Sequence, residues 1–420
     1  MQKLLAAVTG LVLVGLPSFA QGKRLWVLRA PGEMVEYDPA TFAVKQTVKV
    51  PADALQSPQN LQVNRLGQIL FVPSATLPLA DSDAHASHKI WLWDGHAAST
   101  IDLGVTRQLA ETGSNQAISE IAPMVYLSAD GGHLYWFANQ ARRLARDEVD
   151  LSTATSWLAW RTDLTGASRE DLVSAKFPDC RCTTGTCEET CPYAQIWVPS
   201  DGVDKFFLMT QFVAGQTSPA YQASARYEEK DGKWTARQLT DPLRRVLDAE
   251  HEGNVIVEAI PDTGCCGWAN RSDDQTLVLI DAKPRAVFDE IATYKNPDYD
   301  VSFYTSNAFL SPSSRSVAMT ITATSQPNKP IQLADQGQAN PEESQAIRKA
   351  LTELPAVEAK ELEDPPRRLA FLPHATSIGW IGDQEILILE NHSLTVYNVA
   401  TGTRRKTTVR ADDAARVFLR

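Results

Sequence analysis

The stretch Ser128-Ala129-Asp130-Gly131-Gly132-His133-Leu134-Tyr135-Trp136 joins a tight polar turn to a strand of aliphatic and aromatic residues. Asp and Gly provide the backbone angles and local hydrogen bonds that a hairpin turn requires, and the residues after them favour a strand. The same pattern returns at intervals of about 45 to 70 residues, and such a period indicates a repeat architecture. Its other occurrences begin at Gly22, Gly67, Asp201, Gly253, Ser313 and Gly382.

A second hairpin follows most of these strands. The clearest instance is Arg161-Thr162-Asp163-Leu164-Thr165-Gly166, in which a strand ends in an Asp- and Gly-containing turn. Each repeat is therefore predicted to be a four-stranded antiparallel meander, and such a sheet is stable when it packs against its neighbours around an axis. The remaining hairpin turns begin at Tyr37, Trp93, Glu229, Ile280 and Tyr397.

The segments 128–135 and 160–166 resemble the WD40-like repeat of TolB-type β-propellers, and looser copies of it cover residues 22–420. The resemblance implies an all-β fold in which residues 21–420 form a single β-propeller. It implies little about function, because the family includes scaffolds, sensors and appendages of enzymes. The chain also lacks the separate domain that TolB itself has beside its propeller.

The two ends of the mature chain predict how the propeller closes. The first strand, residues 25–28, has no strand before it in its own repeat, whereas Ala415-Arg416-Val417-Phe418-Leu419 is a lone strand at the other end. We expect these two strands to share one blade, because a closed ring leaves no open sheet edge. This pairing gives seven four-stranded blades.

A long insertion, residues 324–366, is expected in the sixth blade, where it conceals the last two strands. Asn340 and Pro341 are typical of the start of a helix, and Ile347, Leu351 and Leu354 then form an apolar stripe at helical spacing. We expect this helix to pack against its own propeller. The alternative is a docking helix or a lid for a partner.

Residues 1–20 predict a secretory signal peptide. Lys3 precedes an apolar run too short to span a bilayer, and Pro17-Ser18-Phe19-Ala20 supplies a helix breaker and a cleavage site. The protein is therefore expected to be periplasmic or secreted, without a membrane span, and monomeric. Loss of Lys3 moves the net charge from −11 to −12, and this acidic balance disfavours nucleic acid and anionic lipid as partners.

The long connections predict which face of the propeller carries the function. The turns that join the first strand to the second, and the third to the fourth, are uniformly short. The connections on the other face are long, and loops on a rigid scaffold are where binding residues concentrate. These connections cover residues 73–88, 104–120, 139–156, 176–193 and 261–275, together with the helical insertion.

All six cysteines lie in these long connections. An even number of cysteines in an exported protein predicts disulfides, although four soft ligands close together could instead hold zinc. Bridges from the adjacent pair to the other loop are expected, and a strained, redox-active bond within that pair is the alternative. The residues concerned are Cys180, Cys182, Cys187 and Cys191 in one loop and Cys265 and Cys266 in the other.

Trp268, Asn270 and Arg271 follow the adjacent cysteines and are the predicted ligand-binding residues. An aromatic side chain beside a fixed loop is a frequent recognition element, and a plug between blades is the alternative for Trp268. The polar stretch from Asp81 to His88 has carboxylates and imidazoles that could bind a divalent metal, but a solvated loop is the preferred interpretation.

No nucleophile elbow, zincin, P-loop or dinucleotide-binding motif is present in the sequence. The leading hypothesis is a non-catalytic propeller, without a cofactor, that binds an envelope protein or a carbohydrate through its long-connection face. The alternative is a metal-dependent hydrolase or lactonase, and a redox protein that uses Cys265 and Cys266 is a third hypothesis. The metal ligands of the hydrolase would be drawn from residues such as Asn60, Glu120, Glu250 and Asn307.

Overall fold

The computed structural model describes most of the residues that the repeats predict to be strands. The described residues are 23–73, 89–102, 108–109, 118–143, 149–150, 156–176, 193–213, 220–239, 243–249, 255–259, 275–280, 283–289, 301–325, 349–410 and 414–420. Among them, no helix is long and apolar enough to cross a bilayer.

Within these ranges the strands form seven antiparallel sheets, and five of the sheets consist of four consecutive strands. The five are β4 (Leu61–Val63), β5 (Ile69–Phe71), β6 (Lys89–Trp93) and β7 (Ala98–Asp102); β14 (Tyr193–Trp197), β15 (Phe206–Val213), β16 (Ala220–Lys230) and β17 (Lys233–Gln238); β18 (Leu243–Ala249), β19 (Val255–Ala259), β20 (Gln275–Ile280) and β21 (Lys283–Asp289); β22 (Val301–Leu310), β23 (Ser316–Ser325), β24 (Ala356–Glu361) and β25 (Arg367–Pro373); and β26 (Ala375–Gly382), β27 (Glu385–Glu390), β28 (Ser393–Asn398) and β29 (Arg404–Arg410).

The sheet between β4–β7 and β14–β17 carries two additional short strands, β8 and β11, which pair with β9 and β10. Its members are β8 (Gln108–Leu109), β9 (Ile118–Leu127), β10 (His133–Arg143), β11 (Val149–Asp150), β12 (Ser156–Asp163) and β13 (Glu170–Lys176).

The seventh sheet joins segments from the two ends of the chain. Its strands are β1 (Leu25–Arg29), β2 (Glu33–Tyr37), β3 (Val44–Lys49) and β30 (Ala414–Leu419). β30 pairs antiparallel with β1, so that Leu25 lies opposite Leu419. A short helix, α1 (Asp53–Gln56), and a 3-10 helix, η1 (Pro58–Asn60), then lead from β3 to β4.

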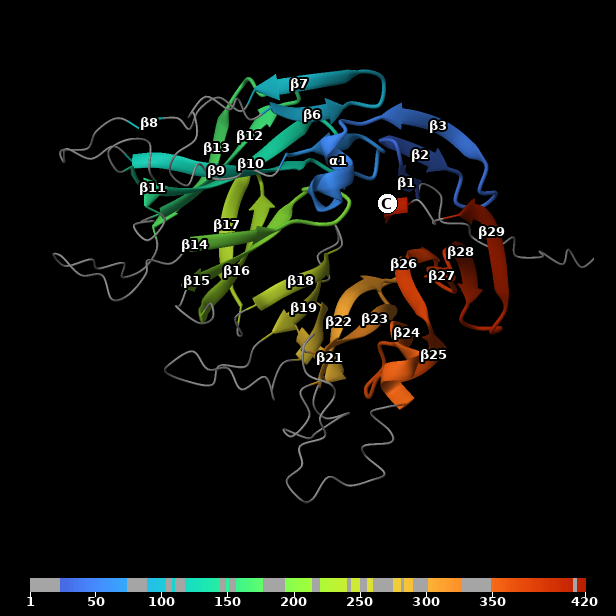
Figure 1. Ribbon diagram of the computed structural model, residues 1–420. Helices are drawn as coiled ribbons and strands as arrows, with labels where there is room; N and C mark the ends of the chain where they lie inside the picture. Colours follow the sequence, from blue (N-terminus) through green and yellow to red (C-terminus); the bar gives the residue numbers. More distant parts are fainter. Residues whose placement is uncertain are drawn as a thin grey trace, which may run out of the picture.

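The sheets follow one another in sequence order around a common centre, close to which the chain ends (Figure 1). We call the strand of each sheet that lies nearest this centre its inner strand. The inner strands are β30, β4, β9, β14, β18, β22 and β26. The prediction of an all-β fold made of four-stranded antiparallel sheets, as in a propeller, is confirmed.

The apolar core lies between neighbouring sheets. β1 shows how: Trp26 and Leu28 pack with residues of β4–β6, whereas Leu25 and Val27 pack with residues of β26–β29. Successive side chains of a strand point to opposite faces, so one strand contributes to two interfaces. Each of these four side chains is fully buried. Alternation along the strand therefore holds adjacent sheets face to face.

The repeated stretches found in the sequence occupy equivalent places. The seven turn-and-strand segments are the second strands counted from the centre, namely β1, β5, β10, β15, β19, β23 and β27. The six hairpin segments lie at the connections between third and fourth strands, which we call the outer turns. The prediction of these hairpins is confirmed.

Asp or Asn side chains stabilise four of the described outer turns through local hydrogen bonds. Asp38 Oδ1 accepts from the main-chain N–H groups of Ala40 and Thr41, at 3.0 and 2.9 Å. Such side-chain-to-backbone bonds favour turns over strands, and the equivalent residues act alike. These are Asp94, Asp163 and Asn398.

The strand bounds narrow the predicted insertion. β23 continues to Ser325 and β24 is Ala356–Glu361, so the third strand of this sheet lies within the range 324–366 that was assigned to the insertion, and β25 begins directly after that range. Residues 349–353 are helical, and Leu351 and Leu354 pack against the core cluster of β22 and β23. Residues 349–353 thus lie against the strands of this sheet, while Asn340, Pro341 and Ile347 lie outside the described residues.

Candidate functional site

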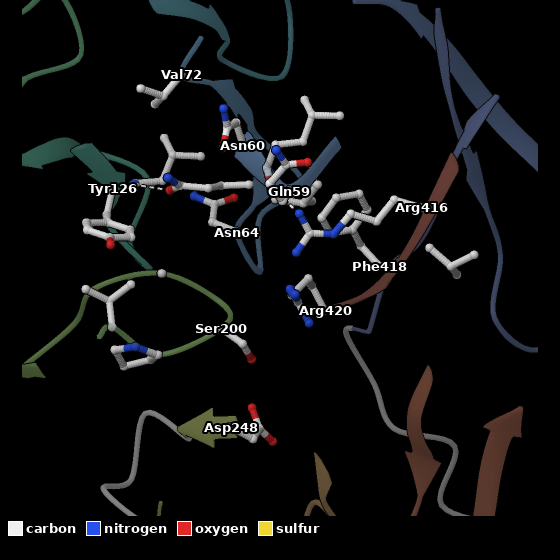
Figure 2. Close-up of a pocket in the computed structure, with 18 of the residues that line it drawn as sticks. Gln59, Asn60, Asn64, Val72, Tyr126, Ser200, Asp248, Arg416, Phe418 and Arg420 are labelled. Carbon is white, nitrogen blue, oxygen red and sulfur yellow. Dashed lines mark hydrogen bonds between the residues drawn. The ribbon is translucent and has the colours of Figure 1, made fainter. Parts of the chain in front are cut away.

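A cavity of about 920 Å³ lies at the centre of the ring of sheets. Residues from all seven inner strands, or from the turns directly after them, line it. Figure 2 shows amide, hydroxyl, aromatic and charged side chains around this space. The polar members of the lining are Gln59, Asn60, Gln62, Asn64, Tyr126, Ser200, Asp248, Asn307, Ser377, Arg416 and Arg420.

Many of the polar side chains on the inner strands bind the neighbouring sheet. Gln62 Nε2 donates to the main-chain oxygen of Val125, at 2.7 Å, and so joins β4 to β9. Contacts of the same kind recur around the centre, and we call them the inter-sheet bonds. They include Arg416 Nη1 to Pro58 O (2.6 Å), Tyr126 Oη to Ile196 O (3.5 Å), Asn307 Nδ2 to Ser377 O (3.2 Å) and Lys23 Nζ to Trp380 O (2.7 Å).

Asp248 belongs to two of these junctions. Its Oδ2 accepts from the main-chain N–H of Leu310, at 3.2 Å, and its carboxyl also hydrogen-bonds Ser200. Burial raises the pKa of Asp248 above the usual carboxyl value, and the Leu310 bond and the charge of Arg420 act in the opposite direction. The carboxylate therefore has both a structural and an electrostatic role at the cavity wall.

Arg416 and Phe418 lie two residues apart in β30 and contact η1 and β4, and Arg420 follows directly after the strand. The guanidinium carbon of Arg416 lies 4.8 Å from the ring centroid of Phe418, and that of Arg420 lies 5.8 Å from it. The buried aromatic ring thus contacts both cationic side chains. Both side chains project into the cavity (Figure 2).

The cavity environment disfavours charge on both arginines. Burial, together with repulsion from Arg420, lowers the pKa of Arg416 to about 10. Burial also lowers the pKa of Arg420, while attraction to Asp248 and Asp201 partly offsets it. Both side chains remain cationic at neutral pH, at a cost in solvation that a bound anion would reduce.

Three further polar atoms in the cavity wall are buried and, among the described residues, have no hydrogen-bond partner. They are Asn307 Oδ1, Ser377 Oγ and Arg420 Nε. Buried polar groups are nearly always hydrogen-bonded, so atoms left in this state beside a cavity are suited to contact a ligand. Together they provide an acceptor, a hydroxyl and a donor.

The residues predicted to bind a ligand or form disulfides lie outside the described residues. The same is true of the polar loop from Asp81 to His88, of Glu250 and of the side chain of Glu120. Asn60 and Asn307 line the cavity, as the hydrolase hypothesis required, but the amide of Asn307 is used in an inter-sheet bond. Outside the described ranges lie Trp268, Asn270, Arg271, Cys180, Cys182, Cys187, Cys191, Cys265 and Cys266.

The described part of the chain contains no group of three or more His, Cys, Asp or Glu residues arranged to hold a metal ion. Among the described residues that line the cavity there is one carboxylate, Asp248, and neither His nor Cys. The described lining therefore has the chemistry of a binding site for polar groups.

Arg416 and Arg420 are cavity residues that were not predicted. The segment 415–419 was predicted as a strand, but without regard to the charges in and after it. The available signal was the spacing of two residues between Arg416, Phe418 and Arg420 at the end of an inner strand.

Comparison with known proteins gives similarity at the level of the fold. No family model matches the sequence, and no curated protein does. Apo AztD from Citrobacter koseri is 11% identical with a TM-score of 0.44, over 95% of this chain and 98% of that chain. Acylaminoacyl peptidase from Pyrococcus horikoshii is 11% identical with a TM-score of 0.41, over 90% of this chain.

Dipeptidyl peptidase 4 from Porphyromonas gingivalis is 10% identical, with a TM-score of 0.38 over 93% of this chain. The matches cover 48% of the acylaminoacyl peptidase and 58% of the dipeptidyl peptidase, so this chain spans about half the length of these two enzymes. Similarity at this level carries no information about function.

Proposed function

We propose that this protein is an exported, non-catalytic β-propeller that binds a carbohydrate in its central cavity. Its seven sheets would be seven WD40-like blades of the TolB type, closed by β30 on β1. The predicted signal peptide supports a periplasmic or secreted location. A protein partner at the same face is the runner-up.

The lining of the central cavity is the observation that carries this proposal. Its volume of about 920 Å³ is within the range of small-molecule sites, roughly 300 to 1,000 Å³. Amides, hydroxyls and guanidinium groups provide donors and acceptors for sugar hydroxyls, and Tyr126 and Phe418 add aromatic surface. Burial raises the pKa of Tyr126 to about 12, so its hydroxyl keeps its proton at neutral pH.

The entrance is expected on the long-connection face. Gln59 lies in η1 directly before β4, while Val72 and Pro73 follow β5, so all three lie at the same end of this antiparallel pair. The chain then enters the long connection of residues 73–88. Because Gln59 is exposed and also lines the cavity, it marks the border between this opening and solvent.

The metal-dependent hydrolase has less support. A divalent metal needs several oxygen ligands that converge, with negative charge to offset its own. The described lining combines one carboxylate with two arginines, and guanidinium groups repel a metal cation. This donor set favours a polar or anionic ligand.

A binding experiment with a variant that blocks the entrance tests the proposal. The mature protein, residues 21–420, would be screened on an array of oligosaccharides, and hits would be measured by calorimetry. Gln59→Trp, which fills the opening, is expected to weaken binding at least tenfold, which corresponds to about 1.4 kcal/mol. Gln56→Trp is the matched control, because Gln56 is exposed in α1 and does not line the cavity.

The proposal fails if no oligosaccharide binds, or if the two tryptophan variants bind a hit as tightly as the wild type. Binding of a purified envelope protein that Gln59→Trp abolishes, with no saccharide bound, would instead support the runner-up.

A further inference from the structure

The cavity has more positive than negative charge among its described residues. Arg416, Arg420 and Asp248 are the charged members of the lining. Asp248 and Asp201 lie close enough to Arg420 to raise its pKa, whereas the charged group that affects Arg416 is the second arginine. Arg416 therefore brings a positive charge to the cavity without a matching anion.

The hydrogen bonds of the two guanidinium groups leave donors available. A guanidinium has five N–H groups. Arg416 uses Nη1 toward Pro58 O at 2.6 Å, with a longer contact to Leu61 O at 3.4 Å. Arg420 uses Nη1 toward the carbonyl of its neighbour Leu419, at 3.1 Å, and its Nε is buried without a partner among the described residues. Both guanidinium groups therefore keep N–H groups that can bind a ligand in the cavity.

The fold holds these two cations near each other in spite of their repulsion. The inter-sheet bond of Arg416 to Pro58 and the contacts of both arginines with Phe418 restrict their positions. Guanidinium groups that face one cavity offer the N–H donors that the oxygens of a carboxylate or a phosphate accept in pairs. A neutral sugar would leave the charge of Arg416 uncompensated in a partly desolvated site.

We propose that the ligand of the central cavity is an acidic saccharide whose carboxylate or phosphate group binds between Arg416 and Arg420. This inference rests on the proposed carbohydrate-binding function and adds the charge of the ligand to it. Asn307, Ser377 and Tyr126, which also line the cavity, are then left for the uncharged part of the sugar, and Asp248 disfavours a second negative group near Arg420.

Calorimetry with matched sugars tests this inference. Glucose, glucuronate and glucose 6-phosphate share one ring, and they differ in carrying no charge, a carboxylate or a phosphate. At pH 7, at least one acidic sugar is expected to bind ten or more times as tightly as glucose. Whether glucuronate or glucose 6-phosphate binds more tightly identifies the preferred anionic group. The preference should fall as salt is added, because ions screen the attraction.

Two variants connect the preference to Arg416. Arg416→Gln is expected to reduce the ratio of acidic to neutral affinity to about one, while Arg416→Lys retains part of it because the charge remains. Arg65→Gln is the control: Arg65 Nε also donates to a carbonyl of a neighbouring sheet, Ala129 O at 2.9 Å, but Arg65 does not line the cavity. The control should keep the preference, and circular dichroism checks that each variant folds.

The possible outcomes distinguish a failure of this inference from a failure of the proposed carbohydrate-binding function. If glucose binds as tightly as the acidic sugars and Gln59→Trp loses this binding, the inference of an acidic ligand is wrong. The cavity would then be a site for neutral carbohydrate. Equal loss of preference in Arg416→Gln and Arg65→Gln would also overturn it. A third outcome is that no sugar binds, but inorganic phosphate raises the melting temperature of the wild type and not that of Arg416→Gln. This result would support an anion site and overturn the proposed carbohydrate-binding function.

Discussion

The outer turns and the inner strands are both rich in polar residues, but they use them in opposite ways. In the outer turns, Asp38 bonds the backbone two and three residues ahead of it, and the bonded groups are exposed. On the inner strands, Gln62 reaches a residue more than sixty positions away in the next sheet. The outer polar groups thus stabilise their own turn, whereas the inner ones hold the ring together.

This difference shows how to recognise the functional residues of such a ring. A polar side chain at the centre is first of all a candidate for an inter-sheet bond, as Gln62 and Asn307 demonstrate. Side chains that have more hydrogen-bond donors or acceptors than the inter-sheet bonds use are the candidates for function. Arg416 and Arg420 meet that condition.

The largest expected effect comes from adding one methyl group at the centre. Gly202 has a φ of +116°, and a Cβ there would approach the main-chain nitrogen and Cα of Ala129 to 2.8 and 2.9 Å. This is where main-chain bonds join Val203 to Leu127 and Ala129. Because backbone cannot give way as a side chain does, Gly202→Ala is expected to lower the free energy of unfolding by about 3 kcal/mol or more.

Gly232, in the outer turn between β16 and β17, is the matched control. Its φ is +73°, and an added Cβ would meet nothing within 4 Å. Gly232→Ala is expected to cost about 1 kcal/mol, from the left-handed backbone alone. Urea denaturation of both variants measures the difference, and equal losses would refute the contrast between centre and periphery.

An intermediate effect is expected when one inter-sheet bond is removed. Gln62→Ala deletes a donor to Val125 O and an acceptor for the N–H of Leu127, at 2.7 and 3.4 Å. The loss in unfolding free energy should be about 1 to 2 kcal/mol. Gln238, exposed on β17, is the control, and its replacement by Ala should change the urea midpoint little. A stability loss in Gln238→Ala that matches that of Gln62→Ala would contradict the assigned role.

The smallest effect concerns the acid stability of the outer turns. Hydrogen bonds from Thr41 and Ala40 lower the pKa of Asp38 to about 2, and similar bonds lower the pKa of Asp94 and of Asp163. The unfolded value is about 3.9, so these carboxylates stabilise the fold fully above that pH and lose the effect as pH falls toward 2.

Asn398 supplies the design of the acid experiment, because it makes the same turn without a titratable group. Asp38→Asn should therefore keep the turn at pH 7 and make the decline of the urea midpoint between pH 4 and pH 2 less steep. The triple variant with Asp94→Asn and Asp163→Asn should enlarge this change. A decline as steep as in the wild type would refute the attribution.

Much of the architecture was predictable because each sheet repeats local chemistry. The Asp- and Gly-containing turns specify hairpins within a few residues, so the second strands and outer turns were located from single stretches such as residues 130–136. The predicted insertion, residues 324–366, includes all of β24. The long connection before this strand obscured its start.

The cavity was harder to predict than the strands around it. Its wall takes a few residues from every sheet, and the sequence does not show which of them converge. Arg416 lies in a short strand that was recognised for its place at the end of the chain, and Arg420 follows it directly. The role of their charges becomes apparent only beside Asp248 and η1. Prediction from sequence instead favoured loops with unusual composition.

The pairing of β30 with β1 has a consequence for how the protein is made. β1 leaves the ribosome among the first strands of the sheets, and it waits for its partner until translation reaches the last of them. The same late segment brings both cavity arginines. A chain interrupted before that point would leave one edge of β1 without its partner strand and would also lack the charges proposed to select the ligand. Binding competence therefore arises in the same step that pairs β30 with β1, and an unfinished copy could not compete for the ligand.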